Sequence, residues 1–370
     1  MKLEPFLLER NQSLYENSVR YNLTESGVHP RSLSQILSPD EVREVAELPL
    51  GYGYTNGSPS LRRAIANLYR ELGEENVLIT NGSAEANFAV IWSLIEPGDE
   101  VAIMLPNYML VSGVLKSFGA NIKPFHLRET LNWAPDLDEL RRVLSVKTKL
   151  IVVCNPNNPT GAVLDRATMD AIAALARERD AYILSDEIYR GTELDGVECP
   201  SFLEVYEKAI VCSGLSKALA LPGLRIGWIA APADVIASCW HRHDYTTIST
   251  SIVSQYAAAK VLQPARRAQI LRYGRELLNV NLKTFRRWVD AHGALFHFIP
   301  PRAGGMAFVR YSTTEKSSAL VTRIRQEKSV FIVAGDWFGM DHYLRFGIGT
   351  DPRTFETGLE LIAEVFEGIA

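Results

Sequence analysis

The sequence predicts an α/β fold, a three-layer α/β/α domain built on a mostly parallel β-sheet, with a smaller α+β lobe beside it. The first observation is that short apolar runs alternate with helical patterns along the first two thirds of the chain. The second is that these runs are short and mostly apolar, which is typical of strands covered on both faces in a parallel sheet. The third is the length of 370 residues, which is more than one compact core accommodates.

The alternation can be followed along the chain. Strands are predicted at residues 77–80, 100–104, 122–125, 150–154, 182–185, 209–212 and 226–231. Helices are predicted between the earlier strands at residues 83–94, 108–118, 136–144 and 166–179. In parallel sheets of this kind ligands bind beyond the carboxyl ends of the strands. The polar residues that follow each strand are therefore the first candidates for a functional site.

The two ends of the chain differ from this pattern. Helices are expected within residues 1–20, from Ser38-Pro39 onward and at residues 61–72, with a loop at 51–60. After about residue 262 a long polar helix at 265–291 precedes short strands at 295–299, 306–309, 330–332 and 343–347. We therefore predict a large domain of residues 45–262 and a small domain formed by residues 1–44 plus 263–370.

Composition and charge argue against several classes of function. A net charge of -4 disfavours a nucleic-acid partner, which requires a basic face. The four cysteines are scattered without metal-site spacing, so we expect buried thiols, no metal and a cytoplasmic location. The first ten residues are charged, unlike a signal peptide, and no window approaches the roughly 18 to 20 apolar residues that cross a bilayer. We therefore expect no membrane partner.

A single lysine, Lys217, lies between two apolar strands among Gly, Ser, Ala and Leu residues. Considered alone, it is most simply a surface residue whose stem packs on the protein. If it is buried instead, desolvation lowers the pKa of its amine and suits it to Schiff-base chemistry. Whether Lys217 is a surface or a buried residue depends on the side chains that the neighbouring strands bring close to it.

Three strands end in polar segments that together suit one ligand. Residues 80–86 join a strand to a helix whose first backbone N–H groups can bind an anion, although a serine N-cap explains them equally well. Residues 155–161 place three asparagines in a turn, and Asp186 ends a very apolar strand where a carboxylate requires a cation or a protonated heterocycle. With Tyr189 and Arg225, these groups fit the phosphate, ring nitrogen, ring hydroxyl and aldehyde of pyridoxal phosphate (PLP).

The chain resembles the fold-type I, class I/II aminotransferase family over nearly its whole length. Residues 214–227 carry the resemblance, because they match the family's lysine signature, including the arginine eight residues after the lysine. The resemblance implies that Lys217 binds PLP as a Schiff base and moves the proton at the substrate Cα. It also implies that Asp186 keeps the ring nitrogen protonated, and that Tyr189 and Asn158 hydrogen-bond the ring hydroxyl.

The resemblance implies further contacts to the cofactor and the substrate. Tyr108 would stack on one face of the ring and Ile188 would cover the other. The phosphate would be bound by Ser83, Ala84, Ser216 and Arg225, with Ser213 or Ser216 replacing the serine that many members carry at the position of Gly214. Tyr52 would reach the phosphate of a neighbouring subunit, which implies a homodimer with shared sites. Arg345 would bind the carboxylate of an amino acid substrate as a bidentate pair. Asn87 stands where an apolar residue is usual, and we expect it to make only a local polar contact.

Four stretches narrow the resemblance to cyclases of the capreomycidine and enduracididine type, which close hydroxyarginines into cyclic guanidino amino acids. These stretches are residues 26–29, 134–138, 221–228 and 244–251, of which the first and last are the distinctive ones. Such a reaction benefits from a second acid or base near the substrate Cβ. The candidates are Glu25, Ser26 and His29 in a loop and Thr250 in a segment expected at a strand end, with Gly27 beside the substrate. His29 and Glu25 are equally well explained as ordinary loop residues.

Two other functions remain open. An aminotransferase of the same fold uses the same cofactor residues and differs in requiring a 2-oxo acid. A transcription regulator with an aminotransferase-like sensing domain carries a basic DNA-binding domain before the fold. Here the fold's own first segment is expected to begin within about 20 residues of Met1, which disfavours a regulator.

Overall fold

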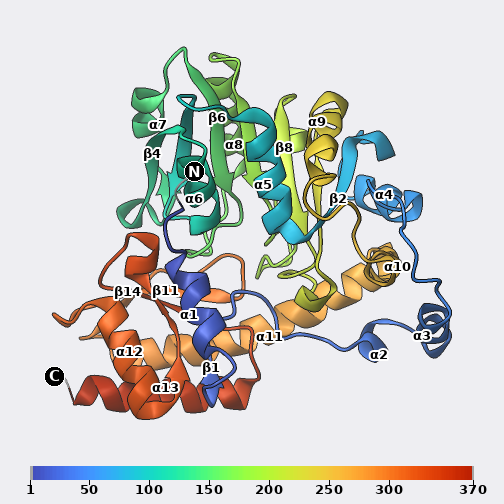
Figure 1. Cartoon of the computed structure of the whole chain (residues 1–370). Helices are drawn as coiled ribbons and strands as arrows, with labels where there is room; N and C mark the ends of the chain where they lie inside the picture. The colour runs from blue at the N-terminus through green and yellow to red at the C-terminus, as the bar shows by residue number, and fades with distance from the viewer. Residues whose placement is uncertain (1–2, 369–370) are drawn as a thin grey trace.

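The computed structural model describes residues 3–368, and it contains a layered α/β domain above a smaller lobe (Figure 1). The central sheet has eight strands in the order β2-β9-β8-β7-β6-β3-β4-β5. The five strands from β8 to β4 are parallel, whereas β2, β9 and β5 pair antiparallel at the two edges. Their bounds are β2 Val77–Asn81, β3 Glu100–Leu105, β4 Asn121–Arg128, β5 Ala134–Pro135, β6 Thr148–Cys154, β7 Tyr182–Asp186, β8 Ala209–Gly214 and β9 Ile226–Ala230. The predicted three-layer fold with a mostly parallel sheet is confirmed.

Helices cover both faces of this sheet because both faces are apolar. On one face, α5 (Gly82–Leu94), α6 (Met109–Ser117) and α9 (Ala233–His243) share a buried core with β-strand residues such as Leu184. On the other face lie α4 (Pro59–Ala66), α7 (Leu137–Val143), α8 (Arg166–Arg177) and α10 (Ile252–Val261), which pack on residues such as Ile183 and Val211. Because successive residues of a strand point to opposite faces, Ile183 and Leu184 belong to different cores.

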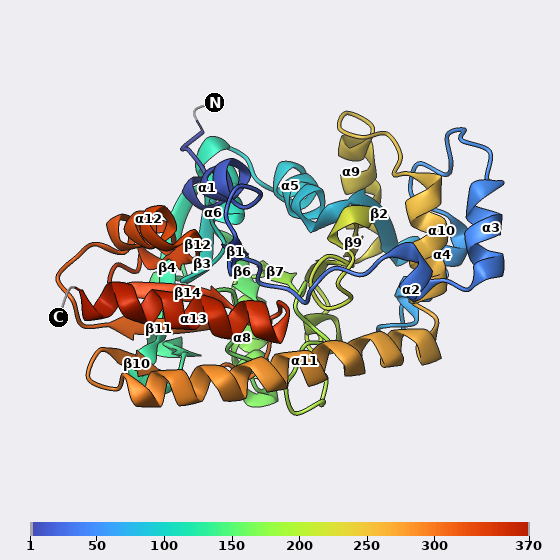
Figure 2. The same ribbon diagram turned by 90° about the horizontal axis from the view of Figure 1, so that it is seen from below.

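The smaller lobe is built on a four-stranded antiparallel sheet in the order β10-β11-β14-β13. Its strands are β10 Phe296–Phe298, β11 Met306–Tyr311, β13 Val333–Ala334 and β14 Tyr343–Gly347. The helices of this part are α12 (Ser317–Lys328), α13 (Pro352–Glu367) and the long α11 (Pro264–Ala291), which runs along one edge of the view in Figure 2, from near α10 to near β10. Residues of α11, α12 and α13 share one apolar core with this sheet.

The N-terminal segment packs closely against the smaller lobe. Strand β1 (Tyr21–Asn22) pairs with β12 (Val330–Phe331), and the chain then passes close to three glycines of the lobe. A Cβ added at Gly347 would lie 2.2 Å from the Glu25 carbonyl oxygen, and one added at Gly349 would lie 1.9 Å from the Gly27 carbonyl oxygen. Only glycine permits this approach of two backbones, which carries residues 25–28 to the boundary between the large domain and the lobe.

Some elements are shorter than the sequence predicts. The helix expected within residues 1–20 is α1 (Leu7–Tyr15), residues 1 and 2 lying outside the described part of the chain. The helix expected at 61–72 begins at Pro59, capped by Ser58, and ends at Ala66. Two short helices, α2 (Leu33–Ile36) and α3 (Pro39–Ala46), lie between β1 and α4. The division into residues 45–262 and the remainder stays a prediction. Within residues 3–368 there is no helix of the length and apolarity needed to span a membrane.

Candidate active site

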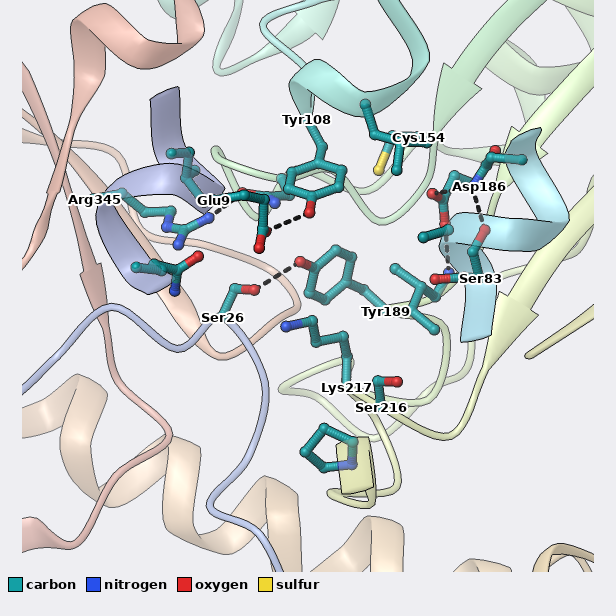
Figure 3. A pocket seen from close by; sticks show the side chains of 18 of the residues that line it. Glu9, Ser26, Ser83, Tyr108, Cys154, Asp186, Tyr189, Ser216, Lys217 and Arg345 are labelled. Carbon is teal, nitrogen blue, oxygen red and sulfur yellow. Dashed lines mark hydrogen bonds between the residues drawn. The ribbon is translucent and has the colours of Figure 1, made fainter. Parts of the chain in front are cut away.

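A cavity of about 430 Å³ lies where the carboxyl ends of β6 and β7 meet the smaller lobe (Figure 3). Its walls come from α1, the loop after β1, the starts of α5 and α6, the segments that follow β6, β7 and β8, and strand β14 of the lobe. It is lined by Leu8, Glu9, Gln12, Glu16, Ser26, Ser83, Ala84, Asn87, Tyr108, Leu110, Cys154, Asn158, Asp186, Ile188, Tyr189, Ser216, Lys217, Pro222, Arg225 and Arg345. Most of the predicted site residues are therefore brought together by the fold.

Asp186, the last residue of β7, presents a carboxylate without a cation. Its Oδ1 accepts a hydrogen bond from the Ile188 N–H at 3.1 Å, and its Oδ2 accepts one from the Asn87 amide at 3.0 Å. Among the described residues 3–368, Asp186 forms no ion pair. Burial raises the pKa of Asp186 to about 6, although both hydrogen bonds lower it. The site therefore suits a ligand that brings its own positive charge to this carboxylate.

An anion cradle lies at the start of α5. Gly82 has a φ of +81°, and a Cβ there would lie 2.3 Å from Nη2 of Arg225. A Cβ on Gly227 would lie 2.4 Å from the backbone nitrogen of Ser83, so strand β9 packs directly against the first turn of α5. These two glycines let the Arg225 guanidinium lie beside N–H groups that the helix leaves unpaired. With the Ser216 hydroxyl on the same cavity, the cradle fits a phosphate.

Two tyrosines line the space between the cradle and the lobe (Figure 3). The Tyr108 hydroxyl donates to the Glu9 carboxylate of α1. The Tyr189 hydroxyl lies 2.8 Å from the Ser26 hydroxyl, and burial raises its pKa to about 12 although Lys217 and Arg345 lower it. Tyr189 is therefore a neutral phenol that can donate to an oxygen in the cavity.

Lys217 extends into the cavity and forms an ion pair with Glu25, the Nζ lying 2.6 Å from Oε1. Burial lowers the pKa of Lys217, but the negative charge of Glu25 and the hydrogen bond to it outweigh burial and raise the pKa. Burial thus acts on this amine as expected, but the net shift of its pKa in this state of the site is upward because of Glu25. For Glu25 burial acts in the opposite direction and raises the pKa. Lys217, the Gly27 N–H and Arg345 outweigh burial and lower the pKa of Glu25 to about 2.

Arg345 of β14 is 2% exposed and only partly paired. Its Nη1 donates to the Asn158 side-chain oxygen at 2.8 Å, and its Nη2 donates to the Thr24 carbonyl oxygen at 2.7 Å. Its Nε is buried without a partner. A guanidinium fixed in this way retains N–H groups for a carboxylate ligand.

Comparison with known proteins is consistent with this geometry. The family model for aminotransferase class I and II matches residues 42–362. The chain belongs to the class I/II aminotransferase family. It is 30% identical to capreomycidine synthase of Streptomyces vinaceus, over 93% of this chain and 89% of that protein. It is also 30% identical to an aspartate aminotransferase of Pyrococcus horikoshii, over 90% of this chain and 88% of that protein.

Solved structures of the family have the same fold. A PLP-dependent aminotransferase from Streptococcus suis superposes with a TM-score of 0.94 at 33% identity, over 100% of this chain and 99% of the other. The PLP-dependent cyclase OrfR superposes with a TM-score of 0.91 at 22% identity, over 100% of this chain and 99% of the other, and at that identity it supports the fold alone.

This class I/II aminotransferase-family protein is a PLP-dependent enzyme. The site fits the cofactor, because it combines a carboxylate without a cation, an anion cradle and a lysine in one cavity. Bound PLP supplies a ring that accepts electrons from the substrate Cα. Asp186 would hold the ring nitrogen, the cradle residues would hold the phosphate, and Lys217 would bind the aldehyde.

The structure places five of the predicted site residues elsewhere. The Ser213 hydroxyl donates to the Glu187 carbonyl oxygen and lies outside the cavity, so of the two serines only Ser216 is placed for the phosphate. His29 lines a separate cavity of about 260 Å³ together with Glu25. Thr250 is buried in the loop between α9 and α10, not at a strand end, because α9 follows β9 before this segment. Tyr52 is 87% exposed, and Gly27 packs on the Lys217 backbone instead of lining the cavity.

Sequence reasoning missed the acidic wall that α1 contributes. Glu9 and Glu16 of this segment line the cavity, and burial together with the charges of Glu25 and Glu9 raises the pKa of Glu16. The helix is held over the cavity by Leu8 in the core, by Phe6 against Tyr108 and by the hydrogen bond from Gln12 to Thr24. Glu16 directly follows α1, seven residues after Glu9, and an i, i+7 spacing in a helical segment places both acids on one face, which was the signal in the sequence.

Proposed function

We propose that the enzyme converts a hydroxy-L-arginine into a cyclic guanidino amino acid of the capreomycidine or enduracididine type. The C–O bond of the side-chain hydroxyl breaks, and a guanidine nitrogen forms a new C–N bond to the carbon that carried the hydroxyl. The hydroxyl leaves with one proton as water, and the guanidine loses one N–H proton. The product is therefore one water lighter than the substrate, and no oxidant or second substrate is consumed.

The charge balance of the cavity carries this proposal. Asp186 and Arg225 also line the cavity, and we assign them to the ring nitrogen and the phosphate of PLP. Beyond these two, three carboxylates, those of Glu9, Glu16 and Glu25, lie at or beside the cavity, together with two cations, Lys217 and Arg345. When Lys217 binds the aldehyde of PLP and Arg345 binds the substrate carboxylate, neither cation balances the acids. Uncompensated carboxylates in a partly enclosed site favour a cationic ligand. A substrate with a guanidinium side chain supplies that charge, which an aspartate or aromatic substrate does not.

The residues near Lys217 support the proton transfers that the reaction needs. Lys217 is placed to move the proton at the substrate Cα, and Glu25 Oε1 lies 2.6 Å from its Nζ and can exchange a proton with it. Tyr189 and Ser26 form a second hydrogen-bonded pair on the same side of the cavity. They are our candidates for the group that donates to the departing hydroxyl. Of the two relatives at 30% identity described above, the one named capreomycidine synthase supports the cyclase reaction, whereas the other is named as an aspartate aminotransferase.

The second candidate function is an aminotransferase of an L-amino acid with a 2-oxo acid. It is favoured by the relatives named as aminotransferases, among them the aspartate/prephenate aminotransferase of Thermus thermophilus at 28% identity. The cofactor residues do not distinguish the two reactions, because both begin with the loss of the Cα proton.

The decisive experiment incubates the PLP-loaded enzyme with 3-hydroxy-L-arginine and with 4-hydroxy-L-arginine in the absence of any 2-oxo acid. We expect a product one water lighter than one of these substrates, with cyclic connectivity by NMR. A product that forms only when a 2-oxo acid is added identifies the aminotransferase and refutes the cyclase. As a matched pair, Glu16→Gln should raise KM for hydroxyarginine, whereas Glu360→Gln on the distant helix α13 should leave it unchanged.

We further propose that the enzyme is a homodimer in which Tyr52 completes the phosphate site of the partner. The loop that carries Tyr52 also exposes Leu50 and Tyr54, and large exposed apolar groups are typical of interfaces. Tyr52→Ala and Lys217→Ala chains should each be impaired alone, and mixing them should restore activity, because one of the two sites in a mixed dimer is intact. If mixed dimers form and activity does not return, Tyr52 does not act across the interface.

A further inference from the structure

Asn87 touches the carboxylate on which the cofactor ring depends. It lies on α5, one turn after Ser83, and is 2% exposed. Its Nδ2 donates to the Ser83 carbonyl oxygen at 3.0 Å and to Asp186 Oδ2 at 3.0 Å. The sequence predicted only a local polar contact for this residue, and the contact to Ser83 is of that kind. The contact to Asp186 joins positions 99 residues apart in the chain.

The orientation of the Asn87 amide is fixed by its surroundings. The Ser83 carbonyl oxygen can only accept a hydrogen bond, so the NH2 group of Asn87 must face it. The same NH2 group then faces Asp186, while the side-chain oxygen of Asn87 is buried without a partner. Asn87 can therefore only donate to Asp186. A donor of this kind stabilises the carboxylate relative to the carboxylic acid.

We propose that Asn87 is a positioning residue that keeps Asp186 ionised and thereby holds the proton on the ring nitrogen of PLP. A hydrogen bond to the carboxylate makes it a weaker base, so a proton shared between Asp186 and the ring nitrogen stays on the nitrogen. A protonated ring withdraws electrons from the substrate Cα more strongly than a neutral ring. The inference rests on the PLP dependence of the family and not on the identity of the substrate.

Among the described residues, the strands next to β7 bring no charged side chain to Asp186 that could replace Asn87 as its donor. The titratable groups that face Asp186 there are the thiols of Cys154 on β6 and Cys212 on β8. Burial raises the pKa of both thiols well above its usual value, so both are uncharged at neutral pH. The only side chain that donates to Asp186 within residues 3–368 is that of Asn87.

Two substitutions separate the contact to Asp186 from the contact within the helix. Asn87→Ser retains a donor that can bond the carbonyl oxygen four residues earlier, but its side chain is too short to reach Asp186. Asn87→Leu removes both contacts and keeps the same number and branching of side-chain heavy atoms. Gln12→Leu, at a cavity residue that does not touch Asp186, is the control.

The readout is the ¹⁵N chemical shift of PLP labelled at the ring nitrogen, measured against pH in the enzyme without substrate. We expect the ¹⁵N shift near neutral pH to move toward that of an unprotonated ring nitrogen in Asn87→Ser and in Asn87→Leu, because Asp186 without its donor is the stronger base and takes a larger share of the proton. The shift should be unchanged in Gln12→Leu. The proposal is overturned if folded Asn87→Ser enzyme keeps the wild-type ¹⁵N shift, since the contact to Ser83 would then be the whole role of Asn87.

Discussion

Replacing Asp186 by asparagine should stabilise the protein when PLP is removed. In the apoprotein the carboxylate is enclosed without a cation, and burial raises its pKa from 3.8 to about 6. A shift of this size corresponds to about 3 kcal/mol of destabilisation at pH values well above 6. The NH2 group of the introduced amide would face the NH2 group of Asn87, which costs about 1 kcal/mol. We therefore expect a net gain of about 2 kcal/mol at pH 8.

The dependence on pH identifies the cause of this gain. Because the pKa of Asp186 is raised on folding, the folded protein binds the extra proton between about pH 4 and pH 6. Wild-type stability contributed by this group is therefore greatest below pH 4, falls as the pH rises to 6 and is constant above about pH 7. Asp186→Asn lacks this loss, so its advantage should appear across this window and vanish at pH 4.

The assay is the denaturant midpoint of the apoproteins between pH 4 and pH 8, with Asp290→Asn as the matched control at an exposed position. In the PLP-loaded proteins the order should reverse, because the neutral amide cannot pair with a protonated ring nitrogen. A difference between the apoproteins that does not change with pH, or a wild-type apoprotein that is the more stable at pH 8, would refute the reasoning.

Three further predictions concern other contacts. Gly227→Ala should lower the melting temperature and the affinity for PLP, because its Cβ would lie 2.4 Å from the Ser83 nitrogen and force β9 away from α5. Gly223→Ala, where a Cβ meets no atom within 4 Å, is the control. Arg345→Lys should raise KM by roughly 10- to 100-fold with an unchanged PLP absorption spectrum, since a lysine retains the charge but loses the paired N–H groups. Equal losses for substrates with and without an α-carboxylate would contradict this. Glu25→Gln should lower the pKa of Lys217 in the apoprotein, measured from the pH dependence of its acylation rate, because burial then acts without the opposing carboxylate.

The central sheet was predictable because each strand carries its own signal. The last five residues of β6 (Thr148–Cys154), for example, form a continuous apolar run, and a run of this kind has few alternatives to a buried strand. Asp186 was found for the same reason, since a carboxylate that ends such a strand needs a special partner. The cofactor set followed from groups that lie at the carboxyl ends of neighbouring strands, where topology brings them together.

The parts that were missed depend on contacts between distant segments. The Glu25 carboxylate that reverses the pKa shift of Lys217 lies 192 residues away in the chain. Glu9 and Glu16 face the cavity only because contacts with the rest of the chain fix α1 there. The sequence of residues 1–20 alone does not indicate which residues these two acids face. Asn87 on helix α5 was recognised as unusual, but its partner Asp186 ends strand β7, 99 residues further along the chain. Thr250 was misplaced because a helix, α9, separates its segment from β9.

The close packing of the N-terminal segment against three glycines of the lobe has a consequence for biosynthesis. Tyr21 pairs with Val330, and Gly305, Gly347 and Gly349 enclose the backbone of residues 25–27. The ribosome makes residues 25–27 long before these glycines, and contacts of such high sequence separation form late. The large sheet can assemble on the nascent chain before the lobe residues that hold α1 and Glu25 have been made. Lys217 therefore meets its carboxylate partner only after residues 305–349 have been translated.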